Sequence, residues 1–165
     1  MRTTRWLAAT VMTLALGAGP ALAARMAPEF ARQAARGGMA EVQLSRLASD
    51  RASDPEVREF AQRMVNDHSR ANDQLERIAR NRGWMLPQRP DAEHRAMLRR
   101  LRQRSGRDFD RAYMRAMVAD HDATVMHFRR YARNGGDRRL RTWAQRTLPT
   151  LVEHRHMARQ TRADT

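Results

Sequence analysis

Residues 54–82 read DPEVREFAQRMVNDHSRANDQLERIARNR, and this stretch decides the fold. Its apolar stripe recurs at steps of three and four residues, the spacing that keeps side chains on one face of an α-helix. The stripe consists of Ala61, Met64, His68, Ala71, Leu75 and Ile78. Because Ser53 or Asp54 can cap a helix that has Pro55 at its first position, a helix is predicted over 54–82. His68 therefore stands in the middle of an otherwise apolar helix face.

Three further stretches repeat this rhythm and are predicted to be helices over 28–52, 108–133 and 138–161. Each of them also carries one polar residue near the middle of its apolar stripe. These residues are Glu41, His121 and His154. An unpaired polar side chain in such a stripe costs about 1 to 3 kcal/mol, so the four polar residues are expected to satisfy one another or a ligand.

The predicted turns indicate which helices pair with each other. A short turn at residues 53–54 joins the first two helices into an antiparallel hairpin, and residues 134–136, with Asp137 as cap, join the last two. The loop 84–90 leads from the first hairpin into a short helix over 91–104. Two antiparallel hairpins with one long connection are the topology of ferritin-like bundles. We therefore predict an all-α fold, a ferritin-like four-helix bundle with an extra short crossover helix.

Counting outward from the turns predicts the depth of each polar residue. Glu41 lies twelve residues before Ser53 and His68 lies fourteen after Asp54, so these two are expected at nearly equal height. In the second hairpin, His121 lies thirteen residues before Asn134 and His154 lies seventeen after Asp137. Their distances from the turn therefore differ by four residues, which is about 6 Å along a helix. A kink at Pro149 would absorb part of this offset.

Two irregularities lie close to these positions. Gly37 and Gly38 occur inside the first predicted helix, where each glycine is less favourable than alanine by about 1 kcal/mol. Either they open the bundle beside Glu41, or they allow another helix to approach closely. Pro149 either bends the last helix near His154 or starts a second helical segment.

The N-terminus has the organisation of a secretory signal peptide, predicted to be residues 1–23. Two arginines, Arg2 and Arg5, precede an apolar run over 6–16, and residues 21–23 form a small-x-small cleavage site. An uncleaved anchor is the alternative, although the apolar run is short for a membrane span. The protein is therefore expected to be periplasmic or secreted.

Residues 24–165 are predicted to form a single helical-bundle domain, because their number matches that of one domain with its own core. The chain contains no cysteine, which excludes disulfides and a lipid-modified cysteine. No serine, cysteine or lysine nucleophile constellation is present, so hydrolase or transferase chemistry is not predicted.

The chain is strongly basic, with a formal net charge of +14, and every basic residue is arginine. Most arginines interleave with acids, but residues 94–107 hold six arginines and no acid. They are Arg95, Arg99, Arg100, Arg102, Arg104 and Arg107. This basic patch is expected to attract an anionic envelope polymer or lipid headgroups. Because interleaved aromatic residues and a nucleic-acid module are lacking, specific nucleic-acid recognition is not predicted.

Four strings support a resemblance to a known family. They occupy residues 37–42 (GGMAEV), 60–68 (FAQRMVNDH), 110–121 (DRAYM through DH) and 147–154 (TLP through EH). In these strings the chain resembles a bacterial family of exported proteins, domain of unknown function 4142, often labelled outer membrane proteins. The resemblance implies a ferritin-like helical bundle with no established activity.

The residue types in the polar layer indicate which metal chemistry is available. Ferritin-like di-iron sites use Glu-x-x-His pairs, whereas Val65, Val118 and Leu151 stand three residues before the histidines, so a di-iron site is disfavoured. One carboxylate and three imidazoles suit a single Zn²⁺ or Fe²⁺ ion, held by Glu41, His68, His121 and His154. Copper is a further candidate, because each histidine has a methionine one turn away, but methionines at this spacing more often fill the core, and that alternative is favoured here. These methionines are Met64, Met117 and Met157.

Other titratable residues have predicted supporting roles. Asp67, Asp120 and Glu153 directly precede the three histidines, and they either orient imidazoles on neighbouring helices or pair with arginines at the surface. Three histidines that lie off the stripes are predicted to be solvated. They are His94, His127 and His156.

Two functions follow from these patterns. The first is an exported bundle that binds one transition-metal ion, Zn, Fe or Cu, in envelope stress protection rather than turnover. The alternative is a non-enzymatic envelope protein in which the Glu and His layer is satisfied internally and fixes helix register, while the basic patch contacts an anionic surface.

Overall fold

The computed structural model describes residues 19–164, so residues 1–18, most of the predicted signal peptide, lie outside the described part of the chain. The described residues form five α-helices and no strand, which confirms the all-α prediction. The helices are α1 (Gly19–Arg51), α2 (Pro55–Arg82), α3 (Ala92–Arg102), α4 (Gly106–Asn134) and α5 (Arg138–Asp164).

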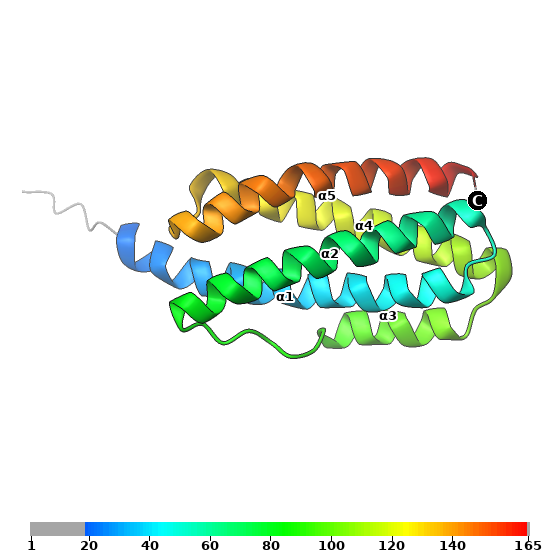
Figure 1. Ribbon diagram of the computed structural model, residues 1–165, viewed down its shortest axis with the longest axis horizontal. Coiled ribbons are helices and arrows are strands. Elements are labelled where there is room, and N and C mark those ends of the chain that lie inside the picture. Colours follow the sequence, from blue (N-terminus) through cyan, green and yellow to red (C-terminus); the bar gives the residue numbers. More distant parts are fainter. Residues whose placement is uncertain (1–18, 165) are drawn as a thin grey trace, which may run out of the picture.

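The four long helices lie side by side as a bundle (Figure 1). α1 packs mainly against α2, and α4 mainly against α5; contacts of α2 with α5 and of α1 with α4 join the two hairpins. Helices that contact each other along the bundle run in opposite directions, and α2 and α4 run in the same direction. The short α3 lies outside the bundle, against α1 and α4. Together with the loop that precedes it, α3 connects α2 of the first hairpin to α4 of the second.

Local chemistry explains most helix boundaries. α2 begins after Asp54, whose side chain accepts a hydrogen bond from the Glu56 amide at 2.8 Å, and it ends at Gly83, whose φ of +67° suits glycine. α5 begins after Asp137, which accepts from the Leu140 amide at 2.8 Å. These caps confirm the predicted ends of both helices.

Two prolines do not end their helices. α1 begins at Gly19 rather than at residue 28 and continues through Pro28, because Ala27 and Phe30 on either side of the proline are buried in the core. α5 runs as one helix through Pro149, so the alternative in which this proline starts a second helical segment is wrong.

Two apolar clusters fill the bundle on either side of its middle. One lies toward the α1–α2 turn and includes Leu44, Phe60, Met64 and Met114; the other lies toward the α4–α5 turn and includes Phe30, Leu75, Val125 and Leu140. The residues between these clusters are polar and equally buried. Within residues 19–164, no helix combines the length and the apolar character needed to cross a membrane.

Candidate metal centre

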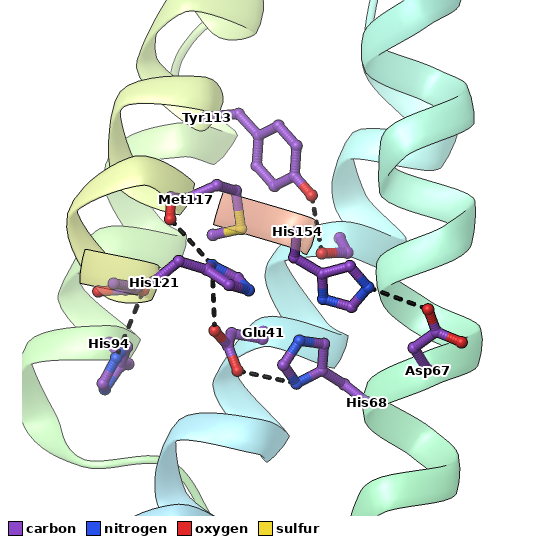
Figure 2. Close-up of polar contacts among 10 residues, drawn as sticks. Glu41, Asp67, His68, His94, Tyr113, Met117, His121 and His154 are labelled. Atoms are coloured by element: carbon purple, nitrogen blue, oxygen red, sulfur yellow. Dashed lines mark hydrogen bonds and ion pairs between the residues drawn. The ribbon is translucent and has the colours of Figure 1, made fainter. Parts of the chain in front are cut away.

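Each long helix brings one polar side chain to the same level of the bundle (Figure 2). Glu41 comes from α1, His68 from α2, His121 from α4 and His154 from α5, and all four are buried. One nitrogen of each imidazole lies within 4.8 Å of a nitrogen of the other two. The ring centres are 5.3 to 5.6 Å apart, so the offset expected between His121 and His154 does not separate them.

Each imidazole has one nitrogen held by an acceptor on the outside of the cluster. The Nδ1 of His68 lies 2.9 Å from Glu41 Oε2, and the Nδ1 of His121 lies 2.9 Å from the Met117 carbonyl. The Nε2 of His154 lies 2.9 Å from Asp67 Oδ2. An acceptor at one nitrogen keeps the proton there and leaves a lone pair on the other nitrogen of a neutral ring.

The other nitrogen of each ring has no hydrogen-bond partner among the described residues. These atoms are His68 Nε2, His121 Nε2 and His154 Nδ1. In Figure 2 the three rings surround a common space, with their outer nitrogens engaged elsewhere. Three buried ring nitrogens without hydrogen-bond partners are costly, whereas metal-binding histidines use one nitrogen for the ion and the other for an orienting acceptor. The arrangement fits one metal ion.

Glu41 occupies a different place from the three histidine nitrogens. Its Oε2 contacts the outer nitrogen of His68, and its Oε1 lies 3.6 Å from the outer nitrogen of His121. The structure therefore brings Glu41 to the cluster as the acceptor that orients His68, with a weaker electrostatic contact to His121. Sequence periodicity could place Glu41 at this level but could not say which imidazole nitrogen it meets.

The charges of the layer follow from burial and from the Glu41 contacts. Burial raises the pKa of Glu41, but His68 and His121 outweigh this effect and lower it to about 2. Burial lowers the pKa of His68, and the Glu41 charge raises it above its usual value. Burial lowers the pKa of His121, and burial together with the His68 charge lowers that of His154 to about 4. Without a metal, Glu41 and His68 form an ion pair and two imidazoles remain neutral.

The acids that precede the histidines take both of the predicted roles. Asp67 orients His154, as the first role requires, and it also lies 3.6 Å from Arg63. Glu153 takes the second role, because it is exposed and pairs with Arg63 at 2.7 Å. Asp120 faces an imidazole on a neighbouring helix, but one outside the cluster, since its Oδ2 lies 3.7 Å from the Nε2 of His94 on α3.

Two histidines predicted to be solvated are half-buried, so that prediction is wrong for them. His94 lies 2.9 Å from Asp91 through Nδ1. The nearby Asp120 carboxylate raises the pKa of His94 to about 9, although burial lowers it. His127 stacks on Phe30 with ring centres 5.0 Å apart. The spacing Asp91-x-x-His94 at the start of a helix was the available signal for the first contact. His156 is exposed, as predicted.

The basic patch lies on α3 and in the turn that follows it. Five of its arginines are exposed, and Arg95 is half-buried and donates to the Pro90 carbonyl. None of the six pairs with a carboxylate of residues 19–164. By contrast, arginines such as Arg80 and Arg159 are held by acids.

Comparisons with known proteins identify a family for this chain. No curated protein and no solved structure matches it. One family model does match, over residues 12–161, and its description is domain of unknown function (DUF4142). This match covers most of the chain and includes all five helices except a few terminal residues. The chain therefore belongs to the family described as domain of unknown function (DUF4142).

Proposed function

We propose that this protein is an exported, ferritin-like helical bundle that binds a single transition-metal ion through His68, His121 and His154. The observation that carries the proposal is the set of three buried imidazole nitrogens that face one space without a hydrogen-bond partner. The outer nitrogens of the same rings each meet an acceptor, which is the arrangement that orients histidines around metal ions. The order of two hairpins with a crossover between them supports the ferritin-like assignment.

Zn²⁺ is the ion that suits this donor set best. Zn²⁺ commonly binds three histidines and keeps a fourth position for water or another ligand. Fe²⁺ and copper ions also bind imidazole, but the facing donor atoms include neither a carboxylate, which iron sites commonly use, nor a sulfur, which Cu⁺ sites commonly use. In the metal-free protein His68, paired with Glu41, carries a proton on each ring nitrogen, and binding would displace the one on Nε2, so it would release a proton and weaken at low pH.

The proposed role is metal binding in envelope stress protection rather than turnover. The centre lacks the bridging carboxylates of di-iron enzymes, since Val65, Val118 and Leu151 occupy those positions. The outer nitrogens of the three rings instead meet Glu41, the Met117 carbonyl and Asp67, and these acceptors hold the imidazoles in place.

Elemental analysis and titration test this proposal. The untagged mature protein is purified, its bound metals are measured by mass spectrometry, and the metal-free form is titrated with Zn²⁺, Fe²⁺ and Cu⁺. One ion per chain is expected, and the double variant His68→Ala, His121→Ala is expected to lose it. The matched control is His127→Ala, His156→Ala, which removes two histidines that lie outside the cluster.

A wild-type protein that binds none of these ions would overturn the proposal. Equal loss in both double variants would also contradict it, because the effect would then not depend on the cluster. In either case the Glu41 and His68 layer would be a structural feature that fixes helix register.

A second candidate function is contact with an anionic envelope surface through the basic patch. The observation that favours it is that these six arginines follow one another from α3 to the start of α4 with no acid among them, and that none of them pairs with a carboxylate of residues 19–164. Binding to phosphatidylglycerol vesicles, measured by flotation, is expected to weaken as salt rises. The variant with Arg99, Arg100, Arg102 and Arg104 changed to Gln should lose this binding.

The control for the patch changes an equal number of exposed arginines elsewhere. They are Arg77, Arg129, Arg138 and Arg139, each changed to Gln. If this control loses vesicle binding to the same extent, net charge rather than the α3 patch is responsible, and the second candidate is rejected.

A further inference from the structure

A pocket of about 480 Å³ opens beside the histidine centre. Its lining includes Glu41 and His68, which belong to the buried layer, and Glu29 and Glu93, which are exposed. The pocket therefore extends from the surface to the edge of the layer. Residues of α1, α2, α4 and α5 contribute to its wall, together with the start of α3.

The lining of the pocket is acidic although the chain as a whole is basic. It contains five carboxylates and one arginine, Arg36, whereas the full chain has a formal net charge of +14. The carboxylates are those of Glu29, Glu41, Asp91, Glu93 and Asp120. His94 lies between Asp91 and Asp120 and offsets part of this charge. His68 offsets the charge of Glu41 in the same way, so the five carboxylates exceed the three cationic side chains by two. This excess of negative charge favours cations in the pocket.

Buried polar atoms without partners also line the pocket. Glu41 Oε1, His68 Nε2 and Trp143 Nε1 are unpartnered among the described residues, and all three side chains are more than nine-tenths buried. The Glu41 oxygen accepts and the Trp143 indole N–H donates hydrogen bonds, so such a wall can hold the water of a hydrated ion. This observation is independent of the charge count, and it indicates polar contents at the inner end of the pocket.

The sequence left two roles open for Gly37 and Gly38 of α1, to open the bundle or to allow close helix contact, and each glycine takes one of these roles. A Cβ added at Gly37 would meet no atom within 4 Å, and Gly37 lies in the pocket wall. A Cβ added at Gly38 would instead collide with the side chain of Asn72 on α2. Gly38 thus allows close helix contact, whereas the missing side chain of Gly37 leaves the pocket open.

We propose that this pocket, lined by carboxylates and kept open by Gly37, is the passage through which a divalent cation enters and leaves the histidine centre. The proposal rests on the metal-binding function proposed above. A passage of this kind affects the rates of binding and release equally, because the ion follows the same path in both directions. Its obstruction leaves the dissociation constant unchanged, in contrast to the loss of a ligand.

Stopped-flow spectroscopy with Co²⁺ tests the passage, since Co²⁺ bound by three imidazoles absorbs visible light. In Gly37→Leu, association and dissociation are both expected to slow by about tenfold, because entry then requires the helices to move apart. Gly37→Ala is the matched control, which adds only a methyl group and should keep wild-type rates. Circular dichroism checks that each variant is folded.

A second pair of variants tests the charge at the mouth and does not depend on the packing of Gly37→Leu. Glu29→Arg, Glu93→Arg should slow Co²⁺ association by about tenfold at low ionic strength and much less at high salt. Asp50→Arg, Glu59→Arg makes the same change of charge at exposed positions outside the pocket, and it should have a smaller effect.

The outcomes separate the passage from the function on which it rests. A wild-type protein that binds no Co²⁺ and no Zn²⁺ overturns the metal-binding function, and the passage with it. Wild-type binding with unchanged rates in a folded Gly37→Leu overturns the passage alone. Equal slowing by the two charge-reversal pairs also overturns it, because net charge would then explain the rates.

Discussion

Asp110 and the histidine layer are both buried polar sites of this bundle, but their atoms are satisfied to different extents. The Asp110 carboxylate on α4 accepts hydrogen bonds from the Ser53 amide at 3.1 Å, the Asp54 amide at 3.0 Å and the Ser53 hydroxyl. All its partners lie in the α1–α2 turn, so Asp110 ties that turn to α4. The histidine layer leaves three ring nitrogens and one oxygen of Glu41 without partners among the described residues.

This difference is the one expected between a structural site and the metal-binding site proposed for the histidine layer. A buried polar group with all its partners stabilises the fold, whereas each buried group without a partner costs about 1 to 3 kcal/mol. The layer at the middle of the bundle therefore reduces stability in the metal-free state, and a bound ion would recover that stability. Substitutions at the two sites should separate stability from metal affinity.

The largest effect on stability is expected at the satisfied site. Asp110→Ala leaves the Ser53 and Asp54 donors without an acceptor and should lower the free energy of unfolding by about 3 to 4 kcal/mol. Zn²⁺ affinity should not change, because Asp110 lies outside the cluster. Urea denaturation and zinc titration measure the two quantities. Asp108→Ala is the control, since Asp108 is an exposed partner of Arg111. Loss of zinc affinity without loss of stability would contradict the comparison.

The next effect concerns the pH dependence of the metal-free protein. The pKa of His154 is about 4 in the folded protein and 6.5 in the unfolded chain, because burial and the His68 charge lower it. Between these values only the unfolded chain takes up the proton, so stability falls as pH falls from about 6.5 to 4, by about 3 kcal/mol from this group. Below that, the lowered pKa of Glu41 makes stability fall further from pH 4.5 towards 2.

Urea denaturation at several pH values measures this loss. His154→Gln, whose amide can still donate to Asp67, should lack the part of the loss between pH 6.5 and 4, and His156→Gln should keep it. The same pH profile in wild type and His154→Gln would show that this histidine does not carry the effect.

A smaller effect is expected at the acceptor of His154. Asp67→Asn replaces the carboxylate that holds the outer nitrogen, and it should weaken zinc binding by about 10 to 100-fold. Glu153→Gln is the control, because Glu153 pairs with Arg63 at the surface and does not contact a histidine. Competition with a chromophoric chelator measures both affinities. Unchanged affinity in Asp67→Asn would mean that Asp67 does not orient a ligand.

The smallest effect compares the two glycines beside the layer. Gly37→Ala should raise the free energy of unfolding by about 0.5 to 1 kcal/mol, because alanine favours the helix and its methyl group enters open space. Gly38→Ala should give a smaller gain or none, because Asn72 must move to admit the methyl group. Thermal and urea denaturation of both variants measure the difference. An equal gain at both positions would contradict the close contact assigned to Gly38.

Much of the fold and part of the candidate site follow from local sequence. The stripe through His68 and the caps at Asp54 and Asp137 predicted helices that the structure confirms with small changes at the ends. The start of α1 was misjudged, because the burial of residues around Pro28 outweighs the tendency of proline to begin a helix. The contacts of His94 were also missed, because Asp120 belongs to another helix.

The sequence by itself determined which residues share a helix face, since that depends only on the 3.6-residue period of the chain. It thereby selected Glu41, His68, His121 and His154 as polar residues inside apolar stripes. Only the tertiary structure decided that the three imidazoles turn one nitrogen each toward a common space, and that Glu41 meets the outer nitrogens of His68 and His121. The reason is physical: helix rotation and side-chain rotamers are set by packing against other helices, and no local pattern records which nitrogen faces which partner.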